Sequence, residues 1–158
     1  MNDVRARPNS VPWPPIIYLT AIAVSVLLNV FYPLPWVGQP WSGILIVLGW
    51  LMIAAFVAIN ISATRTMRRA GTTVRPDRGT DHLVTEGLFS FTRNPLYVAG
   101  TMLILGIGLV TGILWFLPLA ILAAFAVQKL AIEREERHLQ ARFRQTYLGY
   151  ARRVRRWI

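Results

Sequence analysis

Two long stretches without any charged residue dominate the hydrophobic pattern of this chain. The first covers residues 8–64, which is 57 residues, and the second covers residues 94–128, which is 35 residues. A water-soluble domain carries roughly 25% charged residues, whereas the hydrocarbon core of a bilayer excludes charge. The pattern therefore predicts an integral membrane protein.

Each uncharged stretch is long enough for two membrane-spanning helices. In the first, prolines and aromatic residues between Tyr32 and Trp41 predict a turn, because proline interrupts helices and Trp and Tyr favour the headgroup level. In the second, Gly112 marks the expected turn. The predicted fold is all-α and forms a single membrane domain, with four transmembrane helices in two hairpins at residues 16–31, 43–62, 95–111 and 113–130.

The basic residues predict how the helices are oriented in the membrane. All seventeen Lys and Arg residues lie before the first predicted span, in the central segment 63–94, or after residue 128, so that the two expected outer turns hold none. Basic residues stay on the cytoplasmic side of a membrane. We therefore expect a multi-pass protein with a cytoplasmic loop at 63–94 and both termini in the cytoplasm.

The tail of the chain has a different pattern, in which apolar residues recur at helical spacing with arginines between them. The spacing predicts an amphipathic helix over 131–156 at the cytoplasmic face. The arginines near its end are most simply explained as anchors to anionic lipid. The apolar positions are Ile132, Leu139, Phe143, Tyr147, Tyr150 and Val154, and the arginines are Arg152, Arg153, Arg155 and Arg156.

The composition excludes several kinds of functional site. The chain has no cysteine, which excludes disulfides, iron–sulfur clusters, thiolate zinc sites and a cysteine nucleophile. Its two histidines, His82 and His138, are too far apart in sequence to predict a metal centre. The net charge of +10 could indicate nucleic acid binding, but the arginines lie beside apolar spans. We therefore expect a membrane-surface role and no nucleic acid partner.

Three glycines in the second uncharged stretch, Gly106, Gly108 and Gly112, superficially resemble a dinucleotide-binding motif. That motif requires a preceding strand and a different spacing. The pair Gly108 and Gly112 is more typical of a helix-packing surface inside a membrane.

The start of the third predicted span can be explained in two ways. Asn94 at the N-cap and Pro95 at the first helical position are ordinary residues for the start of a helix. A helix N-terminus beside Arg93 is also suited to binding an anion.

The tail contains a second group of candidate functional residues. Glu135 and Glu136 flank the apolar stripe of the predicted helix, and Arg142 follows Glu135 two turns later on the same side. Surface ion pairs would account for such residues. Ionisable groups beside an apolar face at a membrane are also typical of a functional site.

Two motifs of this chain resemble those of the isoprenylcysteine carboxyl methyltransferase family and of its phospholipid N-methyltransferase relatives. The first consists of residues 82–89 followed by 93–100, with the sequences HLVTEGLF and RNPLYVAG. The second is the glutamate pair at 135–136 with the tail positions Leu139, Phe143, Tyr147, Tyr150 and Val154. The resemblance covers residues 81–156. It implies an S-adenosylmethionine cofactor held between the segment before the third span and the tail helix.

Carried over by position, the resemblance also implies which residues contact the cofactor. The chain departs from the family pattern at three of the motif positions: Asn94 stands where the family has His, Phe89 where it has Tyr, and Arg144 where it has Gly. In addition, the His that some relatives carry two positions before the Leu-Val pair would fall on Asp81. The expected contacts are Asp81, His82, Leu83, Val84, Phe89, Arg93, Asn94, Pro95, Leu96, Tyr97 and Glu135.

Methyl transfer from a sulfonium requires alignment and exclusion of water, not a metal. We therefore expect methylation of a lipophilic acceptor that enters from the bilayer. The leading hypothesis is carboxyl O-methylation of an isoprenylcysteine-like substrate, with Arg142 orienting the carboxylate. Phospholipid N-methylation, with Glu136 or Glu135 as the base, is the alternative. A membrane reductase that uses NADPH and a non-enzymatic scaffold are further hypotheses.

Overall fold

The computed structural model describes residues 11–71 and 83–158, and within these ranges every regular element is helical. Three helices are long and apolar enough to cross a membrane, while α3 is apolar but has only 17 residues. The all-helical membrane class is thereby confirmed. The elements are α1 (Trp13–Phe31), α2 (Trp41–Arg69), the 3-10 turn η1 (Gly87–Ser90), α3 (Pro95–Thr111), α4 (Phe116–Val127), the π-helical turn η2 (Gln128–Ile132) and α5 (Glu133–Arg153).

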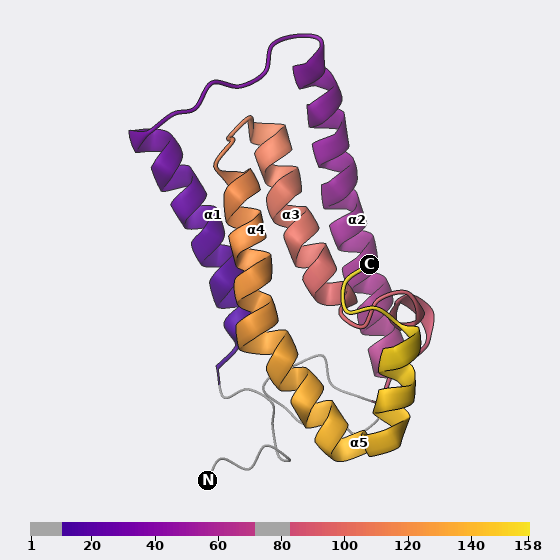
Figure 1. Ribbon diagram of the computed structural model, residues 1–158. Helices are drawn as coiled ribbons and strands as arrows, with labels where there is room; N and C mark the ends of the chain where they lie inside the picture. The colour runs from indigo at the N-terminus through magenta and orange to yellow at the C-terminus, as the bar shows by residue number, and fades with distance from the viewer. Residues whose placement is uncertain (1–10, 72–82) are drawn as a thin grey trace.

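The four apolar helices lie side by side in the order α1, α4, α3, α2 (Figure 1). α1 packs against α4, and α2 packs along α3. Of the two predicted hairpins, only α3 and α4 form a packed pair; Gly112 in the left-handed conformation ends α3. The two helices of the other predicted hairpin, α1 and α2, lie apart because the α3–α4 pair stands between them.

α2 is longer than its sequence pattern predicts. The expected span 43–62 lies inside a helix that continues to Arg69, so that part of the predicted loop 63–94 is helical. Only 6% of the most apolar 18-residue stretch of this helix is buried inside the protein. A large exposed apolar surface of this kind is suited to contact with lipid.

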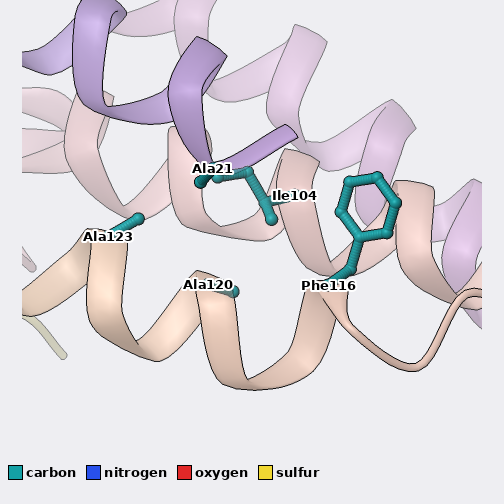
Figure 2. Close-up of a cluster of buried hydrophobic side chains, with 5 residues drawn as sticks. All are labelled: Ala21, Ile104, Phe116, Ala120 and Ala123. Carbon is teal, nitrogen blue, oxygen red and sulfur yellow. The ribbon is translucent and has the colours of Figure 1, made fainter. Parts of the chain in front are cut away.

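The core between α1, α3 and α4 is built mainly from small side chains (Figure 2). It contains one bulky aromatic residue, Phe116, whose side chain is 1% exposed. Small residues let helix backbones approach closely, which is how membrane helices gain packing energy. The buried cluster consists of Ala21, Ile104, Phe116, Ala120 and Ala123.

α2 and α3 make their closest approach at Gly49 and Gly106. A Cβ added at Gly49 would lie 2.8 Å from the Gly106 carbonyl oxygen, and one at Gly106 would lie 2.9 Å from the Gly49 oxygen. Gly108 approaches the side chain of Phe116 at the start of α4 closely enough that an added Cβ would collide with it. The helix-packing interpretation is confirmed for Gly108 and extends to Gly106, whereas Gly112 serves as a helix end.

α4, η2 and α5 follow one another without an intervening loop over Phe116–Arg153, 38 residues in all. The predicted tail helix over 131–156 is wrong in two respects. The helix is broken at Arg144, whose φ is 45°, and it ends at Arg153. The break turns the end of α5 back toward the end of α2 (Figure 1).

We expect Gly49→Ala to destabilise the protein by about 1–3 kcal/mol, because the new methyl group would meet a backbone oxygen that cannot move aside. Gly43→Ala is the matched control on the same helix, since its nearest neighbour would be the Gln39 side chain at 3.6 Å. Thermal unfolding in detergent measures both variants. Equal melting temperatures for the two would contradict the close approach of α2 and α3.

We expect Arg144→Gly to stabilise the protein by about 1 kcal/mol, because a side chain at positive φ is strained and glycine is not. Gln145→Gly is the control: this neighbour is exposed and has no positive φ, so glycine there should destabilise the helix by about 1 kcal/mol. The same melting experiment compares them. Destabilisation by both variants would show that Arg144 has an ordinary helical conformation.

Candidate functional site

A pocket lies between the end of α2, the segment 83–94 and α5. Its cavity volume is about 120 Å³, and about 620 Å³ when the adjoining space open to solvent is included. Its lining combines apolar side chains with polar and ionisable ones. The lining residues are Met67, Leu83, Val84, Phe89, Arg93, Asn94, Glu135, Glu136, Leu139, Tyr147 and Tyr150.

Three local features of the chain bring these walls together. The extra length of α2 places Met67 at the pocket, and the short turn η1 places Phe89 there. The break at Arg144 turns the end of α5 so that Tyr147 and Tyr150 line the pocket as well. The Tyr150 hydroxyl donates a hydrogen bond of 2.6 Å to the Phe89 carbonyl, which fastens this end of α5 to the segment 83–94.

Glu136 is held by two arginines. Arg156 donates from Nε to Oε1 at 3.0 Å and from Nη2 to Oε2 at 2.6 Å, which is the bidentate geometry that guanidinium and carboxylate groups favour. Arg93 Nη2 lies 3.1 Å from Oε1. Both oxygens of this carboxylate are therefore engaged by guanidinium groups.

Glu135, the neighbouring carboxylate, has a different environment. It accepts a hydrogen bond of 2.5 Å from the Tyr97 hydroxyl and lies beyond the uncharged part of the helix, which ends at Gln128. The pKa of Glu135 is raised to about 7: burial is the main cause, the Tyr97 hydrogen bond opposes the rise, and the negative charge of Glu136 adds to it. Glu135 is therefore poised to gain or lose a proton near neutral pH.

Arg93 contacts both the pocket wall and Glu136. Its Nη1 donates to the Tyr147 hydroxyl at 3.2 Å. Its Nε is buried and has no hydrogen-bond partner among the residues that the structure describes. A buried donor without a partner costs free energy, so an acceptor atom of a ligand would stabilise this arrangement.

The start of α3 differs from the capping interpretation. Pro95 is the first helical residue, as expected, but Asn94 makes no side-chain cap. Its Nδ2 instead donates to the Arg156 carbonyl at 2.9 Å. Asn94 therefore ties the start of α3 to the C-terminal segment of the chain.

The structure brings most of the sequence-predicted site residues to this one pocket. Pro95 and Leu96 are not in its lining, and Tyr97 reaches the site through Glu135. Asp81 and His82 lie outside the described residues. Those that line the pocket are Leu83, Val84, Phe89, Arg93, Asn94, Glu135 and Glu136.

Arg142, the predicted substrate-orienting residue, is exposed and is not in the pocket lining. Sequence reasoning also missed several residues. Tyr147, Tyr150 and Leu139 were assigned to an apolar stripe, although their motif positions were recognised. Met67 belongs to no motif, and Arg156 was assigned to lipid anchoring.

Comparison with known proteins identifies the family. A family model described as phospholipid methyltransferase matches residues 44–146. A search of curated proteins found no match. The matched range includes most of α2, all of α3 and α4, and the glutamate pair, and it ends before Tyr147. Since it covers more than half of the chain, the protein belongs to the phospholipid methyltransferase family, within the isoprenylcysteine carboxyl methyltransferase-like superfamily, and is an S-adenosylmethionine-dependent membrane methyltransferase.

Proposed function

We propose that the pocket binds S-adenosylmethionine and that the protein methylates the amine headgroup of a phospholipid. The observation that carries this proposal is a pair of groups in the pocket: the Arg93 Nε, which has no hydrogen-bond partner among the residues that the structure describes, and Glu135, which accepts a hydrogen bond from Tyr97. The Arg93 guanidinium is suited to binding an anion, and the Glu135 carboxylate is suited to binding a cation or accepting a proton.

The residues of the pocket fit the chemical groups of the cofactor, which when bound supplies an electrophilic methyl group on a sulfonium. Arg93 would hold the cofactor carboxylate by a charge-assisted hydrogen bond. Glu135 would face its positive groups. Phe89, Leu83 and Val84 provide an apolar wall for the adenine ring.

The proposed topology places this pocket at the cytoplasmic surface of the bilayer. α1, α2, α3 and α4 would each cross the membrane, with both termini on the cytoplasmic side. α3 would then span about 25 Å, which is less than the usual core of about 30 Å and requires local thinning. Thinning would let a lipid headgroup reach the pocket. Exposed arginines at the same end would bind anionic lipid: Arg65, Arg68, Arg69, Arg152 and Arg153.

Glu135 supports an amine as the methyl acceptor. A protonated headgroup amine has no free electron pair, so a base must first take its proton. We assign this role to the Glu135 carboxylate in place of Glu136, because both oxygens of Glu136 are engaged by arginines. The free electron pair of the amine would then be able to accept the methyl group that the cofactor supplies when it is bound.

Carboxyl O-methylation of an isoprenylcysteine-like acceptor is the second candidate. It was expected to depend on Arg142, which is exposed outside the pocket lining. The observation that still favours it is Arg93, a guanidinium inside the pocket that is able to orient a carboxylate. A reductase would instead bind NADPH, so binding of adenosylhomocysteine without binding of NADPH by the purified protein excludes that alternative.

We expect Glu135→Gln to lower methyl transfer to a phospholipid amine about 100-fold, because the variant cannot accept a proton. The wild-type rate should rise with pH through about 7 as Glu135 loses its proton, and the variant should lack this step. Transfer of labelled methyl groups into phosphatidylethanolamine vesicles measures both. Glu133→Gln is the control, since Glu133 forms an exposed ion pair with Lys129. An unchanged pH profile in Glu135→Gln would remove the base from the proposal.

We expect Arg142→Lys to change turnover less than about twofold with either acceptor, because an exposed arginine contributes little. Arg93→Lys should lower turnover at least about tenfold. Lysine keeps the charge, but its single nitrogen cannot replace the three guanidinium nitrogens, of which Nη1 contacts Tyr147, Nη2 contacts Glu136 and Nε is left for the ligand. The assay compares phosphatidylethanolamine with a farnesylcysteine analogue. A severe loss in Arg142→Lys with the carboxylate acceptor alone would restore the assignment of Arg142 to substrate.

A further inference from the structure

The segment 154–157, which follows α5, lies along the start of α3. It lies outside the range matched by the family. Thr92 and Arg155 form a parallel β-bridge, in which the Arg93 amide donates to the Arg155 carbonyl at 2.9 Å. We refer to residues 154–157 as the C-terminal strap.

Two further contacts seat the strap on the rest of the site. The Arg156 carbonyl accepts hydrogen bonds from Asn94 Nδ2 at 2.9 Å and from Thr92 Oγ1 at 3.2 Å. The indole of Trp157 donates to the Gln128 side chain in the π-helical turn at 2.8 Å. The strap therefore connects the segment before α3 with the beginning of η2.

We propose that Arg156 is a positioning residue of the methyltransferase site, which acts by occupying the bidentate face of Glu136. This proposal rests on the proposed binding of S-adenosylmethionine. The side chain of Arg156 uses Nε and Nη2 on the two oxygens of Glu136. Arg93 is then left with one contact to Glu136, through Nη2 alone.

The consequence of this arrangement concerns Arg93 Nε. A guanidinium beside a carboxylate favours the two-point contact that Arg156 makes. If Arg156 were absent, Arg93 would be able to turn Nε and Nη2 together onto Glu136 and to withdraw Nε from the ligand. Arg156 prevents this pairing. It therefore keeps a buried donor available in the pocket for the carboxylate of the cofactor.

The same geometry explains why four neighbouring arginines are not equivalent. Arg152, Arg153 and Arg155 are exposed, whereas the Arg156 side chain is 33% exposed and pairs with Glu136. An anchor to anionic lipid needs only charge, and lysine would serve. A residue that occupies both oxygens of a carboxylate needs the planar fork of arginine.

The first test measures adenosylhomocysteine binding to purified full-length protein by calorimetry. Arg156→Gln should weaken binding about tenfold, corresponding to about 1.4 kcal/mol, and Arg156→Lys should weaken it nearly as much. Arg152→Gln is the control and should bind as the wild type does. If Arg156→Gln and Arg156→Lys both bind as the wild type does, the positioning role is wrong while the proposed function stands. If the wild-type protein binds no adenosylhomocysteine, both proposals are overturned.

The second test separates positioning from general stability. If Arg156 acts through Glu136, the double variant Glu136→Gln with Arg156→Gln should bind no more weakly than Glu136→Gln alone. Additive losses would show that Arg156 acts independently of Glu136 and would overturn the proposal. Thermal unfolding without ligand shows whether each variant is folded.

The third test probes the strap without any ligand. Because the chain has no cysteine, Thr92→Cys with Arg155→Cys introduces a single pair at the β-bridge. Oxidation should remove both thiols from reaction with a maleimide tag, whereas a control pair of Thr92→Cys with Gln145→Cys should keep them reactive. Free thiols in the Thr92–Arg155 pair would show that the strap is not seated beside α3, and this outcome would overturn the role of Arg156 even if its variants do not fold.

Discussion

Exclusion of charge from the bilayer determines where this protein can carry out chemistry. The two uncharged runs leave no acidic or basic side chain along most of α1, α2, α3 and α4. The acidic and basic side chains are therefore confined to the ends of these helices and to the segments that precede, join or follow them. The pocket is the meeting point of three such pieces: the end of α2, the segment before α3, and α5. A cofactor that is polar and an acceptor that is lipophilic meet most readily at such a boundary.

At that boundary, two adjacent carboxylates have different chemical properties because their neighbours differ. Glu136 faces Arg93 and Arg156, and its charge is neutralised twice over. Glu135 faces a tyrosine hydroxyl in a poorly hydrated environment and titrates near neutral pH. Two carboxylates in different environments can serve one site in different roles, one as a fixed charge and the other as a proton acceptor. Arg93 and Arg156 occupy both oxygens of Glu136, so this carboxylate is unsuitable as a base and instead holds the two arginines in place.

Much of the fold follows from the sequence, and the exceptions have identifiable causes. α3 has the predicted bounds because Pro95 and Gly112 both mark its ends. α1 begins earlier than expected because prolines are tolerated in the first turn of a helix. α2 continues past its apolar run because arginine and threonine do not end a helix. The partners of each helix depend on packing between distant residues, such as Gly49 and Gly106, and no local pattern specifies that pairing.

The sequence predicts those site residues that belong to local motifs. It does not predict the residues that reach the pocket only because α5 is bent at Arg144. The segment 83–94 and the glutamate pair follow from residue order alone. Helical periodicity assumes a straight helix, so it placed Tyr147 and Tyr150 on the same stripe as Phe143. The break at Arg144 turns these tyrosines into the pocket. Arginine is an unexpected residue at positive φ, and nothing in the pattern signals a bend there. Arg156 differs from the neighbouring arginines because it pairs with Glu136, twenty positions earlier in the chain. The two residues come together only because the chain bends between them. The bend is thus the step that converts a basic amphipathic tail into a wall of the site.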